Sequence, residues 1–463
     1  MYVHFIAIGG SVMHQLAIAL KLHGYRVTGS DDEIFEPAQS NLRRAGILPK
    51  SLGWFPEQLT SDIDAVILGM HAKPDNPELL QAKALGVKIY SFPEYIYQES
   101  IRKKRVAIGG SHGKTSTTAM IMHVLQKFGF HFDYLVGARL EGFAQSVNIS
   151  GAPVIICEAD EYPASAIESR PKFHFLHPHI AVLTGIAWDH INVFPTFENY
   201  LLQFEIFIQM IEPGGILVYN NNDDTLSALV NKQIRSDITY KPYHLPTYFI
   251  EDGRTDVTIE GQKGTLQVFG NHNLLNLSAA WLVCQELKID AATFVSHISS
   301  FKGASKRLEL LCSNKNLNIY RDFAHAPSKV KAAIEAVNQQ FPDRKLIAVL
   351  ELHTYSSLNS EFLQEYKFSM ENAGSAAVFY SSHALELKGM PTLSPAMVTE
   401  GFSKDGLQVF NIKQDLEKWL LRQDYNNTNL LMMSSGNFEG LDVQDIINYK
   451  LAPLKQEDTL GKV

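Results

Sequence analysis

The chain has 463 residues and a formal net charge of −8, which is long enough for about three domains. Its acidic balance argues against nucleic acid or an anionic membrane surface as the main partner. The three cysteines lie far apart, at 157, 284 and 312, a pattern that excludes a disulfide framework or a zinc cluster and fits a reducing compartment.

Two further absences narrow the class of protein. No uncharged apolar run approaches the roughly 18 residues of a membrane span. The first residues form an apolar strand pattern without a basic segment before it, so we expect no secretory signal peptide. The sequence therefore predicts a cytoplasmic protein of several domains.

Apolar segments alternate with helical patterns over the first hundred residues. The expected elements are strands over 3–8, 26–30 and 62–69 and a helix over 13–23. Such alternation predicts parallel βαβ units and a nucleotide-type fold. Gly9-Gly10-Ser11-Val12 is a poor dinucleotide fingerprint because it lacks Gly-x-Gly-x-x-Gly. Asp31, after the second strand, could hold a ribose hydroxyl, but a purely structural α/β unit stays an open alternative.

A short charged joint, Ile101-Arg-Lys-Lys-Arg105, follows and marks the first expected boundary. We interpret this run as solvated surface and no more. The expected domains are 1–103, 104–300 and 301–463.

The second segment opens on the most informative motif of the chain. An apolar strand over 106–108 leads into Gly109-Gly-Ser-His-Gly-Lys-Thr115, and a helical pattern runs over 117–128. Such a loop can hold phosphate oxygens on its backbone N–H groups, while Lys114 adds a charge and Thr115 a hydroxyl for Mg²⁺. The strict phosphate-loop pattern fails because residue 108 is isoleucine, so a glycine turn beside a solvated lysine stays the alternative.

Acidic and histidine side chains follow the next two expected strands. The strand over 153–157 ends at Glu158, with Asp160 and Glu161 close behind, and the strand over 180–187 is followed by Asp189-His190. A strand-end acid beside a phosphate loop is a typical Mg²⁺ ligand. Imidazole is an unusual one, because Mg²⁺ prefers oxygen. On the residues alone, His190 is therefore more easily interpreted as a packed or surface residue than as a ligand.

Asparagines open a long helix that we expect to run to residue 286. Asn273 and Asn276 lie three residues apart and share one helix face. Their amides could pair with the edge of an adenine. N-capping by Asn271 or Asn273 is the alternative, and the pattern alone favours it.

The third segment again alternates strands and helices. Strands are expected over 318–320, 345–350 and 429–433, with a helix over 329–340. Its polar motifs are Arg307-Leu-Glu309 and Asp322-Phe-Ala-His325. The tail after Leu454 is polar, and we expect it to fray.

Taken in order, these motifs resemble the Mur ligases of peptidoglycan synthesis over essentially the whole chain. The matching motifs are Gly110-Ser-His-Gly-Lys-Thr-Ser116, Glu158-Ala-Asp-Glu161, Asp189-His190, Asn271-His-Asn273 with Asn276, Arg307-Leu-Glu309 and Asp322-Phe-Ala-His325. The shifted glycine that broke the strict loop pattern is the form this family uses. The implied fold is α/β with a Rossmann-like UDP-binding domain, a central P-loop ATPase domain with a mostly parallel sheet, and a Rossmann-like C-terminal domain.

The resemblance also implies a reaction in which ATP phosphorylates a carboxylate and an amine then displaces phosphate to form an amide. It assigns the ATP site to Gly109, Gly110, Ser111, His112, Gly113, Lys114, Thr115, Ser116, Asn273, Asn276 and Arg307. It places Mg²⁺ on Thr115, Glu158 and His190, and the catalytic set is Lys114, Glu158, His190, Asp322 and His325. It assigns UDP-sugar binding to Gly9, Gly10, Ser11, Asp31 and His71.

Within the family, several members carry a carbamylated lysine just downstream of the histidine, but here no lysine occurs between His190 and Lys232. That absence points to the branch that acts on UDP-N-acetylmuramate itself. Glu161-Tyr162, 189–194 and 434–440 resemble the members that add the tripeptide L-alanyl-γ-D-glutamyl-meso-diaminopimelate rather than those that add L-alanine. Two departures fall in the acceptor-binding domain: His353 stands where an arginine is expected, and Arg321-Asp322 replaces an acidic pair.

Two other classes of protein stay open on sequence alone. A nucleotide-binding regulator that has lost ligation would not need Lys114, Glu158 and His190, yet all three are present. A dehydrogenase fits the first sheet, but the poor glycine fingerprint disfavours it.

Overall fold

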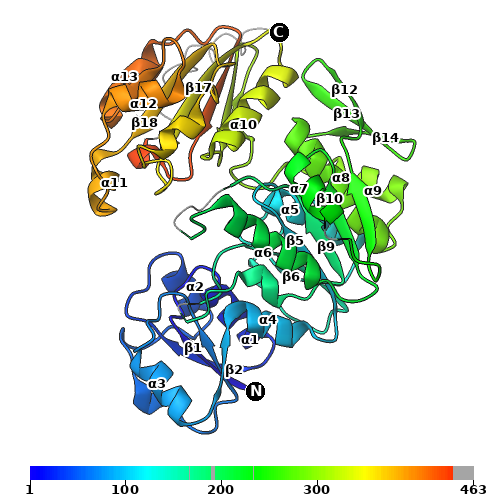
Figure 1. The fold of residues 1–463 in the computed structure, drawn as a ribbon, viewed down its shortest axis with the longest axis vertical. Helices are drawn as coiled ribbons and strands as arrows, with labels where there is room; N and C mark the ends of the chain where they lie inside the picture. The colour runs from blue at the N-terminus through cyan, green and yellow to red at the C-terminus, as the bar shows by residue number, and fades with distance from the viewer. Residues whose placement is uncertain (166, 189–192, 233, 442–463) are drawn as a thin grey trace, which may run out of the picture.

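The computed structural model describes residues 1–165, 167–188, 193–232 and 234–441, in which three groups of strands and helices follow one another. The first group lies at one end of the molecule, the third at the other, and the second between them (Figure 1). The fold is α/β with mostly parallel sheets, as the sequence predicts.

The first group is a parallel sheet in the order β2-β1-β3-β4 with helices packed around it. Its elements are β1 (Tyr2–Ile6), α1 (Met13–Leu22), β2 (Arg26–Ser30), α2 (Ala38–Arg44), β3 (Ala65–Leu68), α3 (Pro77–Ala84), β4 (Lys88–Ser91) and α4 (Phe92–Ser100). Every residue of β1 and β3 is buried, as in parallel strands whose two faces are both covered.

A buried acid joins three segments of this first group. The Glu78 carboxylate accepts hydrogen bonds from Ser30 Oγ at 2.5 Å and from the Phe55 N–H at 2.6 Å, and it lies 3.3 Å from His4 Nε2. Burial opposes its charge, but these partners outweigh burial and lower the pKa of Glu78. The carboxylate therefore stabilises the sheet while it stays ionised.

The second group is built on a sheet in the order β11-β10-β9-β5-β8-β6-β7, parallel except for the β6–β7 pair. Its elements are β5 (Lys104–Gly109), α5 (Lys114–Phe128), β6 (Asp133–Leu135), β7 (Val147–Asn148), β8 (Val154–Glu158), β9 (Ile180–Leu183), α6 (Phe197–Gln209), β10 (Ile216–Asn220), α7 (Asp224–Lys232), β11 (Thr239–Tyr243), α8 (Asn271–Glu286) and α9 (Ala291–Ile298). A small antiparallel sheet of β12 (Thr247–Glu251), β13 (Arg254–Ile259) and β14 (Gln262–Leu266) precedes α8.

Strand β5 is central to this sheet and buries side chains on both faces. Val106 and Ile108 join the core that includes α5 and α8, whereas Ala107 joins the core on the α6 side. Because β8 and β9 both pair with β5 in parallel, the residues after these three strands meet at one edge of the sheet.

The charged joint that leads into β5 is solvated surface only in part: Ile101 and Arg102 are exposed, as its composition predicts, but the residues after them are not. Arg105 is only 4% exposed. Its guanidinium donates to the carbonyls of His177 and Ser100 and to the Glu212 carboxylate at 2.7 Å. Lys103 is likewise held by Asp133 and by the Ser150 carbonyl. The prediction was wrong for Lys103 and Arg105, because these two charges find partners such as Asp133 and Glu212 far away in the sequence.

The third group is a sheet in the order β15-β16-β20-β17-β18-β19, in which only β15 is antiparallel to its neighbour. Its elements are β15 (Glu309–Ser313), β16 (Leu317–Asp322), α10 (Pro327–Gln340), β17 (Lys345–Leu352), β18 (Ser375–Tyr380), α11 (Ser382–Leu387), α12 (Pro395–Phe402), β19 (Gln408–Phe410), α13 (Lys413–Arg422) and β20 (Thr428–Met433). The tail predicted to fray lies outside the described residues.

Helix α10 holds the third group against the second. A Cβ at Gly270, the residue before α8, would overlap Ala336 of α10, so the two helices approach closely there. One turn further along, at the last residue of α10, the Gln340 amide accepts from Thr255 Oγ1 and donates to the Gly253 carbonyl. Within the described residues, no helix is long and apolar enough to cross a membrane.

We predict that Glu78→Gln lowers the free energy of unfolding by about 1–3 kcal/mol at pH 7, because the buried site loses a charged acceptor. Since the pKa of Glu78 is lowered in the folded chain, its contribution is present above the ordinary value of 4.5 and is lost as the pH falls below it. Urea unfolding at pH 7 and pH 4, with exposed Glu57→Gln as control, measures this. A difference that does not shrink at pH 4 contradicts it.

Candidate functional site

The loop between β5 and α5 can adopt its shape only with glycine at two positions. Gly110 and Gly113 have φ of +128° and +82°. A Cβ at Gly110 would overlap Thr184 Oγ1, and one at Gly113 would overlap Asn276 Oδ1. The loop is thus packed between the end of β9 and helix α8, with α5 starting directly at Lys114.

Lys114 is held over this loop by two acceptors. Its Nζ donates to the Gly110 carbonyl and to Glu161 Oε2, both at 2.6 Å. Burial favours the neutral amine, but the carboxylates of Glu161, Asp160 and Glu158 outweigh it and raise the pKa of Lys114. The side chain is therefore a fixed cation at neutral pH.

Thr115 and Glu158 lie side by side at the carboxyl edge of the sheet. Thr115 Oγ1 donates to Glu158 Oε1 at 2.7 Å, and the Gly137 N–H donates to Glu158 Oε2 at 2.8 Å. A hydroxyl and a carboxylate oxygen are ligands of the type that Mg²⁺ prefers. The donor chemistry here fits that ion, although the described residues contain no group of three His, Cys, Asp or Glu side chains that could hold a metal.

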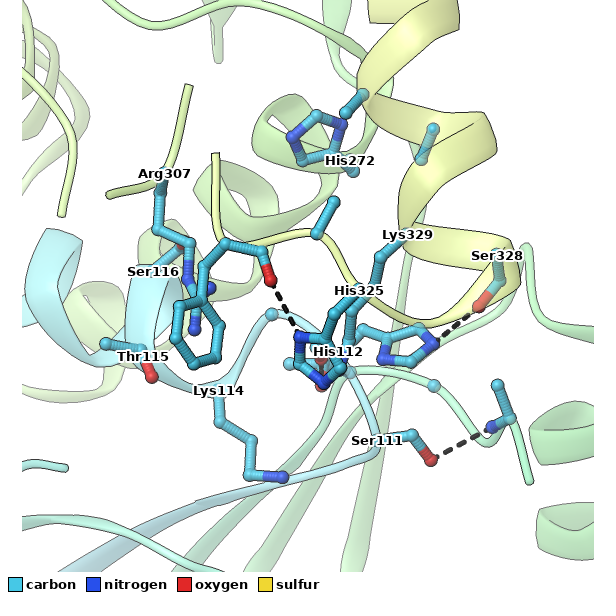
Figure 2. Close-up of a pocket in the computed structure, with 18 of the residues that line it drawn as sticks. Ser111, His112, Lys114, Thr115, Ser116, His272, Arg307, His325, Ser328 and Lys329 are labelled. Carbon is cyan, nitrogen blue, oxygen red and sulfur yellow. Dashed lines mark hydrogen bonds between the residues drawn. The ribbon is translucent and has the colours of Figure 1, made fainter. Parts of the chain in front are cut away.

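A cavity of about 750 Å³ lies between this edge and the third group of elements. Loop residues 111–116, Glu158, Asn273 and Asn276 line it from the second group, and Arg307, Asp322, His325 and Lys329 from the third. Figure 2 shows Arg307, His325 and Lys329 gathered beside the loop that carries Lys114 and Thr115. Side chains from distant parts of the chain thus surround one space.

The third-group wall of the cavity is organised around Asp322. Its carboxylate accepts the N–H groups of Leu308 at 2.6 Å and Ala324 at 2.7 Å. Burial raises the pKa of Asp322, and the positive charge of Arg307 opposes that shift. His325 donates from Nδ1 to the Phe323 carbonyl at 2.8 Å, and the Arg307 guanidinium lies 4.4 Å from the Phe323 ring centre.

One hydrogen bond joins the glycine loop directly to the opposite wall. His112 Nε2 lies 2.8 Å from Ser328 Oγ, at the first turn of α10 (Figure 2). The loop that can bind phosphate is thereby connected to a helix 216 positions away in the sequence.

Asn273 and Asn276 of α8 line the cavity but do not cap their helix. Gly270 is the N-cap residue, and no side-chain cap bond is made, so the capping alternative was wrong. The Asn273 amide donates to the Phe269 carbonyl at 2.9 Å, and Asn276 Oδ1 accepts from Thr117 Oγ1 at 3.2 Å. His272 beside them lines the cavity too, and burial, followed by the charge of Arg307, lowers its pKa to about 4.

The residues predicted to bind a UDP-sugar lie in the first group, outside this cavity. Asp31 Oδ2 accepts from the Gly9 N–H at 2.7 Å, and burial raises the pKa of Asp31. Gly10 and Ser11 continue the same loop, while His71 is exposed in the loop after β3. All of them follow carboxyl ends of neighbouring parallel strands.

His190, with the rest of 189–192, lies outside the described residues. Its predicted place in the metal shell therefore remains a prediction.

Known proteins match both the sequence and this arrangement. Residues 108–284 match the Mur ligase middle domain, and residues 2–103 match the domain described as the Mur ligase family catalytic domain. The UDP-N-acetylmuramate–L-alanine ligase of Aquifex aeolicus is 32% identical over 76% of this chain and 78% of its own. The chain belongs to the Mur ligase family. Members of this family are ATP-dependent enzymes that form amide bonds in peptidoglycan synthesis.

Solved structures of Mur ligases share the fold. The UDP-N-acetylmuramate–alanine ligase of Thermotoga maritima has a TM-score of 0.66 at 21% identity and covers 99% of this chain and 100% of its own. The UDP-N-acetylmuramate:L-alanyl-γ-D-glutamyl-meso-diaminopimelate ligase of Neisseria meningitides has a TM-score of 0.59 at 25% identity and covers 65% of this chain and 98% of its own.

Several side chains at the site were not singled out from sequence. Glu161 stands in a quoted motif, but nothing in its spacing shows that it pairs with Lys114. Thr184, which holds the loop through the Gly109 carbonyl at 3.1 Å, gave no signal beyond its place after a strand. Tyr355 and Lys388, which also line the cavity, gave none.

We predict that Gly113→Ala weakens ATP binding by more than about tenfold, a loss of about 1.4 kcal/mol, because Asn276 must move and the loop must change shape. Gly129→Ala is the matched control: it has φ of +77° at the other end of α5 and open space around its Cβ position. Both variants carry about 1–2 kcal/mol of backbone strain. Isothermal titration measures the ATP affinity of each variant, and thermal unfolding measures its stability, so that a loss of affinity is separated from a loss of stability. Equal ATP affinities in the two variants contradict the prediction.

Proposed function

We propose that this Mur ligase joins UDP-N-acetylmuramate to the tripeptide L-alanyl-γ-D-glutamyl-meso-diaminopimelate with hydrolysis of ATP. The observation that best supports ligase chemistry is the cavity itself. Lys114, Thr115 and Glu158 lie on one of its walls, and Arg307 and Asp322 lie on the other. Residues 1–103 would bind the UDP part, 104–300 would hold ATP, and 301–463 would cover the acceptor. The substrates are a sugar nucleotide and a small peptide, and we expect the enzyme to work in the cytoplasm.

The first step is phosphoryl transfer. One oxygen of the UDP-N-acetylmuramate carboxylate attacks the γ-phosphorus of ATP, so that a C–O–P linkage forms and ADP leaves. Lys114 would contact the outer phosphates, with the backbone N–H groups of 110–116 around them. Thr115 and Glu158, with His190 as the further predicted ligand, would hold Mg²⁺, which supplies charge neutralisation at the phosphates when bound.

The second step is amide formation. The acceptor amine attacks the acyl carbon, and phosphate leaves with the former carboxylate oxygen. Arg307, Asp322 and His325 face the cavity from the third-group wall, where we assign them to the nucleotide and the acyl phosphate. Asn273 and Asn276 would face the adenine, although their present hydrogen bonds to Phe269 and Thr117 occupy part of each amide.

The acceptor is the finer part of the proposal. The likeness to the Neisseria tripeptide ligase and the motifs Glu161-Tyr162 and 434–440 support the tripeptide. The Aquifex relative, which is more similar in sequence, is named for L-alanine, and this makes L-alanine ligation the second candidate.

We predict that ADP release with UDP-N-acetylmuramate is stimulated by the tripeptide and much less by L-alanine. A coupled ADP assay with each acceptor at matched concentrations measures this, and omission of UDP-N-acetylmuramate is the blank. Turnover with L-alanine and none with the tripeptide would overturn the choice of acceptor while leaving the ligase assignment intact.

We also predict that Lys114→Ala lowers ADP formation by about 100-fold or more, because the transition state loses a fixed positive charge. Binding of UDP-N-acetylmuramate should be unchanged, since its predicted site lies in the first group. Lys127→Ala, at the last turn of the same helix, is the control. Full activity in Lys114→Ala would refute the assigned ATP site.

A further inference from the structure

Behind Lys114 lies a buried carboxylate that the proposed chemistry does not use. The Glu161 side chain is 1% exposed and pairs with Lys114 Nζ at 2.6 Å. Lys114 lines the cavity, and so does Tyr162, the residue after Glu161. Glu161 itself does not. Glu161 therefore meets Lys114 from the protein side rather than from the side of the substrate.

The other oxygen of Glu161 receives a hydrogen bond from a buried tyrosine. Tyr200, on α6, is fully buried and packs against the rings of Phe194 and Phe204. Its Oη lies 3.4 Å from Glu161 Oε1 and 2.7 Å from Ser111 Oγ. Ser111 Oγ in turn accepts the Ala187 N–H at 2.9 Å (Figure 2).

Chemistry fixes the direction of every bond in this chain. A carboxylate can only accept, so Tyr200 must donate to Glu161. The tyrosine has a single proton, and its Oη must therefore accept from Ser111, which itself accepts from Ala187. These hydrogen bonds thus join the phosphate loop to the segment after β9 and to the loop after β8. Each donor lies on the side away from Glu161, and Glu161 is the final acceptor.

The same hydrogen bonds limit how many further bonds Lys114 can donate. An ammonium has three donors, and among the described residues Gly110 and Glu161 take two of them. One donor is left for a ligand. A buried charge that is held by a charged partner and a backbone carbonyl has little freedom to turn.

We propose that Glu161 is the positioning residue for Lys114, and that Tyr200 acts through Glu161. This inference rests on the proposed contact of Lys114 with the nucleotide phosphates. The phosphates are held in the ground state by several N–H groups of the loop, whereas transfer requires the ammonium at one place. Loss of Glu161 therefore lowers kcat and leaves the KM for ATP nearly unchanged.

The test uses the full-length enzyme with UDP-N-acetylmuramate and whichever acceptor it turns over faster. We expect Glu161→Gln to lower kcat by about 30- to 100-fold, the size of effect that a misplaced catalytic group produces. We expect Tyr200→Phe to lower kcat by a smaller factor. Because Tyr200 acts through Glu161, the double variant should be no slower than Glu161→Gln alone.

Matched controls separate positioning from stability. Asp133→Asn removes a buried acid that pairs with Lys103 away from the cavity, and Tyr425→Phe removes a buried hydroxyl that donates to the Leu420 carbonyl. Both should keep kcat even if they lower the melting temperature as much. Three outcomes would each overturn the proposal: a raised KM for ATP with unchanged kcat in Glu161→Gln, additive effects in the double variant, or an equal loss of kcat in Asp133→Asn.

The Lys114→Ala variant separates this inference from the proposed function. If Lys114→Ala is inactive while Glu161→Gln keeps wild-type kcat, only this inference fails. If Lys114→Ala is active, the proposed ATP site itself is wrong.

Discussion

The parallel pairing of β5 with β8 on one side and β9 on the other is the constraint on which the site depends. It brings three loops to one edge of the sheet, so that Lys114 and Thr115 come to lie beside Glu158 and Thr184. The glycines at 110 and 113 allow this approach, because the space that a Cβ would need is filled by neighbouring side chains. Polar groups buried here are then satisfied by one another, as with Thr115 and Glu158.

The third group of elements completes the site by covering that edge. Helix α10 docks on α8 at Gly270 and on the small antiparallel sheet through Gln340. This docking places the strand end at Asp322 opposite the glycine loop, and the His112–Ser328 hydrogen bond joins the two walls. A reaction with charged phosphates is favoured between these walls, because their fixed dipoles and charges replace reorganising water.

Local patterns in the sequence were enough for the strands and helices next to the site and for one wall of it. The apolar strand, the glycine loop and helix α5 follow from periodicity and from the residues at 109–115, and the strand end at Glu158 follows from its apolar run. The expected strand over 180–187 ends already at Leu183, because Gly185 and Ala187 bond to Ser111 of the glycine loop and Ile186 bonds to Asp223 instead of continuing the sheet. Motif order also indicated the family correctly.

Pairings between distant residues could not be predicted in this way. Arg105 reads as part of a surface charge run, but it is buried because its partners lie at 177 and 212. Glu161 reads as one more acid after a strand, and only the structure shows Lys114 and Tyr200 around it. Asn273 reads as a helix cap, yet Gly270 takes that position. In each case the deciding contact is tertiary, and neither composition nor spacing contains it.

The central claim is that a carboxylate is activated as an acyl phosphate in the cavity between the two walls. UDP-N-acetylmuramate labelled with ¹⁸O in its carboxylate tests this directly, because the attacking oxygen must leave with the phosphate. The account predicts that mass spectrometry finds one labelled oxygen in the phosphate released during turnover with the acceptor. Unlabelled phosphate formed together with the amide product would contradict it.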